Sequence, residues 1–345
     1  MPQATVGIAG ATGYTGAELL RLLLAHPHAE IGALSSNSHT GRSVGTILPQ
    51  FAGVVPQEFV KTEAASFAAS DAVFVCLPSG AAGQLAAQLH KANPEQRVID
   101  LSADLRLKDP QAYEAWYKRP HPAPELLPKA AYGLPELFRS LLRGSTLIAN
   151  PGCYPTGALL ALAPLVRLGL SDGPFLVDSK SGVSGAGRET RDDLHFPEAN
   201  EALKAYGIGT HRHTPEIEQG LAQLGGHGAP ITFTPHLVPM NRGILTTAYA
   251  PAPEGLTQEQ LTKGYAKLYA GEPFVQLVDA PDVKHVRGSN QCHLAVHLVE
   301  RTRTIVAISA IDNLVKGAAG QAVQTMNLLL GLPETDGLPR SGASP

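Results

Sequence analysis

The chain of 345 residues has little of what marks a secreted, membrane-spanning or nucleic-acid-binding protein. Its three cysteines are widely spaced and odd in number, which argues against a disulfide framework, so we expect a cytoplasmic protein. No apolar run approaches the roughly 20 residues that a membrane-spanning helix needs, and we expect no signal peptide. The net charge is −3 without a basic run, so nucleic acid and membrane surfaces are not expected partners.

What the chain does contain is many residues that form turns. It has 35 glycines and 28 prolines spread along its length, with 43% apolar and 17% charged residues. This composition is typical of a globular protein whose short helices and strands are joined by tight turns. Because 345 residues exceed what one hydrophobic core usually holds, we expect two domains.

The first part of the chain has the pattern of a dinucleotide-binding fold. An apolar strand at 5–9 leads into a glycine-rich loop, a helix from about Ala17 to His26 and a second strand at 30–34. This order of strand, glycine loop, helix and strand is the opening βαβ unit of a Rossmann fold. The pattern continues with a helix at 81–91 and with strands at 71–77, 97–101 and 145–149.

The second part of the chain changes character. Strand-like stretches dominate it, with fewer helices between them, at 175–178, 231–234, 243–250 and 293–311. We therefore predict an α/β protein with an N-terminal Rossmann dinucleotide-binding domain and an α+β catalytic domain with a large mixed open sheet. An apolar helix at 316–330 precedes a tail rich in Pro, Gly and Ser, residues 332–345, which we expect to be mobile.

The most informative stretch delivers a cysteine from the end of a strand to the start of a helix; it reads Ile148-Ala149-Asn150-Pro151-Gly152-Cys153-Tyr154-Pro155-Thr156. Pro151 and Gly152 form the turn, and Pro155 suits the first turn of a helix. Cys153 would then face the helix's unpaired N–H groups and positive dipole end, which favour a thiolate. The alternative is a buried, inert thiol, for which glycine and two prolines are a costly setting.

A phosphate-binding loop is predicted at Gly10-Ala11-Thr12-Gly13-Tyr14-Thr15-Gly16. Its glycines recur every three residues and so depart from the G-x-G-x-x-G pattern, but the loop follows a strand and opens a helix. This context places backbone N–H groups and a helix N-terminus on a phosphate group. The alternative is a glycine turn needed only for close packing of strand and helix.

The end of the second strand indicates which dinucleotide is bound. An NAD enzyme usually has a carboxylate there for the ribose 2′-hydroxyl, but this chain reads Ser35-Ser36-Asn37-Ser38. The hydroxyls of Ser36 and Ser38, with Arg42 four residues beyond, suit a 2′-phosphate instead. We therefore predict NADP as the cofactor, against the alternative of a solvated polar loop.

Two histidines, His211 and His213, precede a helix with a proline near its start. A thiolate enzyme needs a group that takes the thiol proton and later protonates a developing alkoxide, and imidazole titrates in the right range. Either histidine is a candidate for this acid/base role. We predict no metal site, because His293 and His297 alternate with apolar residues as on a strand, which separates them by about 13 Å.

Two further loops are candidate anion sites. The segment from Asp100 to Arg106 ends a strand and offers a guanidinium suited to a phosphate or carboxylate. The segment from Ser179 to Arg188 is rich in Gly and Ser and carries two cations. For each segment the alternative is a solvated loop.

Five of these segments carry a resemblance to a known family: residues 10–16, 100–106, 150–156, 181–188 and 211–217. Together they resemble the N-acetyl-γ-glutamyl-phosphate reductase family of arginine biosynthesis, which is related to the aspartate-semialdehyde dehydrogenases. They occur in the family's order and cover most of the chain. The cysteine and histidine segments are specific in combination, whereas the glycine loop alone is not. Two alternatives stay open: the aminoadipyl-phosphate homologue of lysine biosynthesis, and an aspartate-semialdehyde-type reductase.

The resemblance implies a small acyl-phosphate substrate, a thioester on Cys153 and hydride transfer from NADPH to give a semialdehyde. By its place in the motif His213 is the expected acid/base group, with His211 in reserve. Substrate anions are expected on residues of the two loops, namely Arg106, Ser181 and Ser184. The cofactor is expected on Gly10, Thr12, Gly13, Tyr14, Thr15, Ser36, Asn37, Ser38, Arg42 and Asn313.

The resemblance also implies how the domains are built. The last helix is expected to return to the cofactor domain, which would then consist of residues 1–152 and 313–345. Residues 153–312 would form the catalytic and oligomerisation domain of a homo-oligomer, either a dimer or a tetramer. A non-catalytic NADP-binding sensor would be a different class of function, and the presence of Cys153 together with His213 argues against it.

Overall fold

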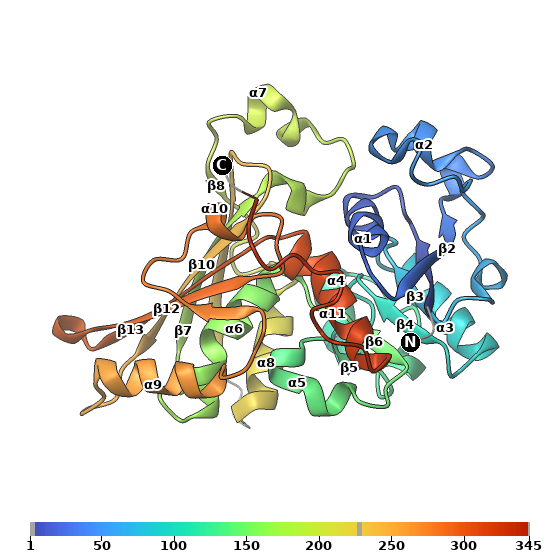
Figure 1. Cartoon of the computed structure of the whole chain (residues 1–345). Helices are drawn as coiled ribbons and strands as arrows, with labels where there is room; N and C mark the ends of the chain where they lie inside the picture. Colours follow the sequence, from blue (N-terminus) through green and yellow to red (C-terminus); the bar gives the residue numbers. More distant parts are fainter. Residues whose placement is uncertain (1–3, 226–229, 344–345) are drawn as a thin grey trace. The chain divides into compact units, whose positions relative to one another are not determined.

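The computed structural model describes residues 4–225 and 230–343 (Figure 1). The chain folds into two compact units. Unit 1 consists of Met1–Pro151 and Ala318–Leu338, and unit 2 consists of Gly152–Gly317 and Pro339–Pro345. Within the described ranges, no helix combines the length and apolar character that crossing a membrane requires.

Unit 1 is built on a six-stranded parallel sheet. Its strands, in spatial order, are β2 (Ala29–Ser35), β1 (Ala4–Ala9), β3 (Ala72–Val75), β4 (Arg97–Asp100), β6 (Leu147–Ala149) and β5 (Ala131–Tyr132). Both faces of β3 are buried, as is typical of parallel strands covered by helices on each side. The helices of unit 1 that pack on its strands are α1 (Tyr14–Leu24), α3 (Ala81–Ala92), α5 (Pro135–Leu142) and α11 (Gly320–Leu329), and α4 (Pro110–Tyr117) also belongs to this unit.

Helix α11 comes from the far end of the sequence, yet it packs against α1 and α5 (Figure 1, red beside blue and teal). Buried polar side chains attach it to unit 1. Gln321 donates to the carbonyl oxygen of Gly133 at 3.1 Å, and Asn327 Oδ1 lies 2.8 Å from Nε2 of buried His26. Because buried polar groups are costly unless they are bonded, these contacts fix how α11 sits on this unit.

Unit 2 is built on a seven-stranded mixed sheet. Its strands, in spatial order, are β11 (Val275–Leu277), β12 (Cys292–Val299), β13 (Thr304–Ile311), β10 (Ile244–Pro251), β7 (Phe175–Gly182), β9 (Ile231–Val238) and β8 (Lys204–Ala205). Helices α6 (Cys153–Arg167), α8 (Thr214–Gly225) and α9 (Gln258–Leu268) pack on this sheet. Strand β7 alternates buried Phe175 and Val177 with exposed Leu176, so the sheet has one covered and one open face.

The predicted fold class is confirmed: a parallel Rossmann-type sheet precedes a mixed open sheet. Three details differ from our expectations. Helix α1 begins at Tyr14 rather than at Ala17. The stretch 293–311 is two antiparallel strands joined by a turn in which Arg303 has φ 48°. The expected helix at 316–330 begins with a π-helical turn, Val315–Ala319, before α11.

The tail also differs from our expectation of a mobile segment. Leu338 is buried, and the Glu334 carboxylate forms an ion pair of 2.8 Å with Arg139 on α5. The main chain of Asp336 accepts a hydrogen bond from Asn327 at 3.0 Å. Composition alone suggested mobility, but one apolar anchor and several polar contacts hold the described part of this tail in place.

Candidate active site

Cys153 is the first residue of α6, as the turn and proline signals predicted. The preceding residue, Gly152, is held from two sides. Its N–H donates to Glu216 Oε1 at 2.8 Å, and its carbonyl oxygen accepts from the hydroxyl of Thr156 at 2.9 Å. The Gly152 cap makes no side-chain hydrogen bond, so the positive end of the helix lies beside the thiol.

A glycine packs against the other side of this cysteine. A Cβ atom at Gly317 would lie 2.9 Å from Cβ of Cys153 and 3.2 Å from its Cα. The Gly317 N–H donates to the carbonyl oxygen of Asp312 at 2.9 Å, which closes the π-helical turn. No larger residue fits at this position unless Cys153 moves, so this turn contributes to placing the thiol.

The two histidines of the motif lie together, and the structure gives the protonation of one of them. Nδ1 of His211 accepts the main-chain N–H of His213 at 3.1 Å, and the ring centroids are 4.9 Å apart. In the neutral ring, therefore, Nε2 of His211 carries the proton. Burial and, to a smaller extent, nearby Arg212 together lower the pKa of His211 to about 4. His211 is neutral at physiological pH.

Aromatic rings surround this pair. Tyr154, the residue after the cysteine, stands edge-on to His211 and His213 with centroid distances of 5.5 and 5.8 Å. Its hydroxyl lies 3.0 Å from the hydroxyl of Tyr206, and Phe233 packs against Tyr154 at 5.4 Å. Burial raises the pKa of both phenols, so they are neutral. The histidines thus lie among uncharged rings, where electrostatic interactions are stronger than in water.

Glu216 belongs to the site although the sequence did not single it out. It lies three residues after His213 on α8, its side chain is buried, and it accepts the Gly152 N–H. The sequence offered one signal: a carboxylate beside Ile217, on the buried side of an amphipathic helix, needs a partner. The identity of that partner depends on tertiary structure.

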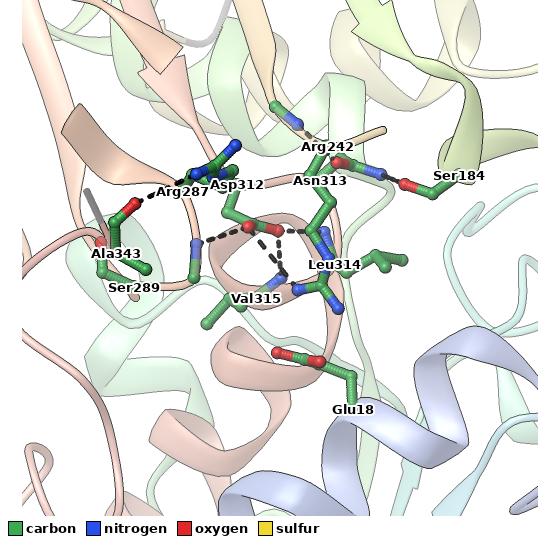
Figure 2. Close-up of polar contacts among 12 residues, drawn as sticks. Glu18, Ser184, Arg242, Arg287, Ser289, Asp312, Asn313, Leu314, Val315 and Ala343 are labelled. Carbon is green, nitrogen blue, oxygen red and sulfur yellow. Dashed lines mark hydrogen bonds and ion pairs between the residues drawn. The ribbon is translucent and has the colours of Figure 1, made fainter. Parts of the chain in front are cut away.

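Asn313, Ser184 and Ser181, which were predicted from separate motifs, all lie in unit 2. The Asn313 side chain accepts the Gly243 N–H at 2.8 Å and donates to Oγ of Ser184 at 2.9 Å (Figure 2). Ser181 is buried, and its hydroxyl donates to the carbonyl oxygen of Gly182 at 3.0 Å. The structure therefore brings Asn313 and Ser184 together, and Ser181 lies close by: a Cβ atom at Gly185 would lie 3.1 Å from Oγ of Ser181 and 3.7 Å from Nδ2 of Asn313.

Arg106 lies in unit 1, where its side chain bonds to main-chain carbonyl groups of the same unit. It is buried, its Nε donates to the carbonyl oxygen of Asn150, and its Nη2 donates to that of Leu101, both at 2.8 Å. These bonds hold the segment that leads to Cys153. A role for Arg106 in binding a substrate anion stays a prediction.

The predicted cofactor residues of unit 1 lie at the end of β1 and the start of α1. Gly10 has φ +84°, and a Cβ there would lie 2.6 Å from the carbonyl oxygen of Cys76. The Gly13 cap of α1 makes no side-chain hydrogen bond, so the helix N-terminus can donate to a phosphate. Gly16 packs so closely that its Cβ would lie 2.5 Å from the Gly10 carbonyl oxygen.

Hydroxyl groups gather beside this loop. Oγ of Ser36 lies 3.3 Å from Oγ1 of Thr12 and 3.4 Å from Oγ of Ser38. Arg42, four residues after Ser38, is exposed. Asn37 accepts the Thr62 N–H at 2.9 Å and so fixes the loop. Hydroxyl donors without a carboxylate at the end of β2 fit a dinucleotide with a 2′-phosphate.

Almost the whole chain matches known proteins. Residues 5–145 match the NAD binding domain of the semialdehyde dehydrogenase family, and residues 153–313 match its dimerisation domain. The N-acetyl-γ-glutamyl-phosphate reductase of Symbiobacterium thermophilum is 50% identical over 98% of both chains. The protein of the same name from Desulforamulus reducens is 48% identical over 99% of both.

Solved structures with the same fold are more distant in sequence. Aspartate semialdehyde dehydrogenase II of Vibrio cholerae, in complex with ASA, has a TM-score of 0.73 at 18% identity, covering 96% of this chain and 99% of that one. The Candida albicans aspartate semialdehyde dehydrogenase with NADP has a TM-score of 0.66 at 15% identity, covering 94% and 98%. At these identities the likeness shows the fold.

Proposed function

This chain belongs to the N-acetyl-γ-glutamyl-phosphate reductase family, and from that premise we propose that it reduces N-acetyl-γ-glutamyl phosphate to N-acetylglutamate 5-semialdehyde in arginine biosynthesis. The reaction uses NADPH and releases inorganic phosphate. The observation that carries the proposal is the placement of Cys153 at the start of α6, in the unit that also holds the histidine pair. A thiol at a helix N-terminus is suited to attack an acyl phosphate.

The first half of the reaction makes a thioester. The Cys153 sulfur attacks the acyl carbon, the carbon–oxygen bond to phosphate breaks, and phosphate leaves with the bonding electrons. The thiol proton passes to His213. The α6 N-terminus stabilises the thiolate, and the bond from Gly152 to Glu216 keeps that terminus in place. His211 orients the adjacent main chain and stays neutral, because burial holds its pKa at about 4.

The second half reduces the thioester. NADPH, when bound, supplies the hydride. His213 protonates the alkoxide oxygen of the resulting thiohemiacetal, and it then takes this proton back as the carbon–oxygen double bond forms and the carbon–sulfur bond breaks. The bonding electrons leave with sulfur, which frees the semialdehyde and restores the thiolate. Residues of the glycine loop and the Ser36 hydroxyl cluster would hold the phosphates of the dinucleotide, and Asn313 is the residue proposed near the nicotinamide. Arg106, Ser181 and Ser184 are the proposed contacts for substrate anions.

We also propose that unit 2 forms a homodimer through its open sheet face. Leu176, Tyr249 and Val306 are paired neighbours on β7, β10 and β13, so they share this face. Leu176 and Tyr249 are 51% and 39% exposed, which is high for an apolar row across the middle of a sheet. The match of residues 153–313 to a dimerisation domain supports dimerisation through unit 2.

Sedimentation equilibrium tests the dimer. Leu176→Lys should convert it to monomer, because the charge would be buried in the centre of an isologous contact. The matched control is Leu168→Lys, since Leu168 is also exposed but caps the C-terminus of α6. A parent protein that is monomeric at micromolar concentration would refute the proposal.

A direct assay tests the activity. The reverse reaction, phosphate-dependent reduction of NADP, is measured with N-acetylglutamate semialdehyde, aspartate semialdehyde and the aminoadipate homologue side by side. We expect the N-acetylglutamate compound to give the highest kcat/KM. A preference for either of the others would reassign the substrate while keeping the reaction class, and no turnover with any of them would refute the proposal.

A further inference from the structure

A hydrogen-bond network in unit 2 has Asp312 at its centre, directly after β13 (Figure 2). This side chain is fully buried. Its Oδ1 accepts the N–H groups of Leu314 at 2.8 Å and Val315 at 3.1 Å, and its Oδ2 accepts the Gly288 N–H at 2.7 Å. Arg242 lies 3.7 Å from the same carboxylate. A buried carboxylate with several N–H donors fixes the loops that supply them.

The network reaches two residues of the proposed mechanism. Asn313 is the neighbour of Asp312, and both ends of its amide are bonded, to Gly243 and to Ser184. The carbonyl oxygen of Asp312 accepts the N–H of Gly317, which packs on Cys153. A shift of Asp312 would therefore move the residue proposed at the nicotinamide and the turn that abuts the thiol.

On its far side the network meets the end of the chain. The Ala343 N–H donates to the carbonyl oxygen of Arg287 at 2.7 Å, and the Asn290 N–H donates to that of Pro339 at 2.9 Å. Gly342 packs so closely that a Cβ there would lie 2.2 Å from the carbonyl oxygen of His285. Residues 339–343 thus lie along the turn 285–290, the turn whose Gly288 donates to Asp312.

We propose that residues 339–343 are a positioning segment for catalysis. By fixing the turn 285–290 they hold the Gly288 N–H on Asp312, and Asp312 in turn holds Asn313 in the orientation that hydride transfer requires. This inference rests on the proposed function, because it takes Asn313 as the nicotinamide contact. The segment acts through its main-chain hydrogen bonds to Arg287 and Asn290, so it is a positioning segment and not a catalytic one.

Three variants test the segment. The first ends at Leu338, and its control ends at Ala343. The second, Gly342→Ala, forces the segment off His285, and its control is Ser341→Ala at an exposed neighbour. The third, Asp312→Asn, keeps the shape of the side chain but replaces one acceptor oxygen with a donor, so either Gly288 or the pair Leu314 and Val315 loses its partner.

We expect kcat to fall in all three variants, by up to about 100-fold for a misplaced reacting group, with KM for the acyl substrate nearly unchanged. The deuterium isotope effect on kcat, measured with NADPH deuterated at the transferred position, should rise toward its intrinsic value because hydride transfer becomes slower relative to other steps. A merely structural defect would reduce the amount of active enzyme and leave this isotope effect unchanged.

Hydrogen exchange of the peptide covering 311–317 gives a readout that does not need activity. It should be faster in the variant that ends at Leu338 and in Gly342→Ala, and unchanged in the two controls. Unchanged exchange there refutes the link to Asp312, whether or not the parent turns over. Faster exchange with an unchanged kcat and isotope effect refutes the positioning role, and an inactive parent refutes the proposed function instead.

Discussion

Two groups close to the Cys153 thiol are uncharged at neutral pH: Tyr206, which interacts electrostatically with Cys153, and His211, whose ring packs 5.4 Å from that of Tyr206. Burial lowers the pKa of His211 to about 4 and raises the pKa of Tyr206, so neither carries charge there. We therefore expect a thiolate to be stabilised by the backbone at the α6 N-terminus, and by His213 once it holds the proton.

The first residue-scale prediction concerns the nucleophile. Cys153→Ser should abolish turnover, because a hydroxyl is a far poorer nucleophile than a thiolate. NADPH should still bind, because the glycine loop belongs to unit 1. Steady-state assays and fluorescence titration with NADPH check both parts. A serine variant within a few-fold of the parent would remove Cys153 from the mechanism.

The second prediction separates the two histidines. His213→Asn should slow acylation and reduction by roughly 10²- to 10⁴-fold, the usual contribution of a positioned acid/base group. His211→Asn should act less on these steps, because His211 is already neutral and serves as an acceptor. Rate constants and the pH dependence of Cys153 alkylation by iodoacetamide are the measurements. If the larger loss follows the His211 substitution, the roles are reversed.

A third prediction follows from the pKa of His211. In the folded protein it is about 4, below the ordinary 6.5, so between these values the unfolded chain binds a proton that the folded one does not. The free energy of unfolding should therefore fall as the pH drops from 6.5 to 4, with His211 contributing at most about 3 kcal/mol. Urea denaturation of the parent and of His211→Asn across this range isolates the effect. If the free energy of unfolding changed with pH equally in the parent and in His211→Asn, the prediction would be contradicted.

At the scale of elements, the loop after β2 determines the cofactor preference. Arg42→Ala should weaken NADP binding more than NAD binding, because only NADP carries a 2′-phosphate for the guanidinium. Dissociation constants for both dinucleotides give the comparison, and Lys61→Ala, at an exposed cation that pairs with Glu63, is the control. Equal losses for the two dinucleotides would show that Arg42 does not contact this phosphate.

The sequence predicted elements well where the signals were local. Period-two alternation revealed β12, and proline and glycine signals placed the start of α6 at Cys153. The turn between β12 and β13 was missed because its residues, Glu300 to Arg303, include neither glycine nor proline. The early start of α1 was missed because it depends on Gly16 packing against Gly10, a contact that the spacing of glycines does not reveal.

The residues of the candidate site also fall into two groups, those that local sequence signals identify and those that only tertiary contacts reveal. Cys153 and the histidine pair could be named from motif and chemistry, because each is needed for a stated step. The contact from Glu216 to Gly152 and that from Gly317 to Cys153 join residues more than 60 positions apart. Such pairs are set by how helices pack on the sheet, and a single sequence carries no record of them.

At the scale of the whole molecule, unit 1 depends on residues that return from the end of the chain. A protein that ends at Gly317 lacks α11, whose apolar residues Val323 and Met326 are fully buried. It would also leave His26 and Glu136 without their partners on α11. We expect loss of NADPH binding and of cooperative melting for unit 1, checked by fluorescence titration and calorimetry. NADPH binding at the parent's affinity would show that α11 is dispensable.

The same return of the chain also sets an order of events during synthesis. The ribosome makes the sheet of unit 1 first, then nearly all of unit 2, and only afterwards α11. At ordinary rates of translation the gap between Pro151 and Ala318 lasts roughly ten to thirty seconds. For that time the part of the parallel sheet that α11 covers stays exposed, and chaperones can bind it. The unit that carries the thiol is therefore almost complete before the unit with the glycine loop can close.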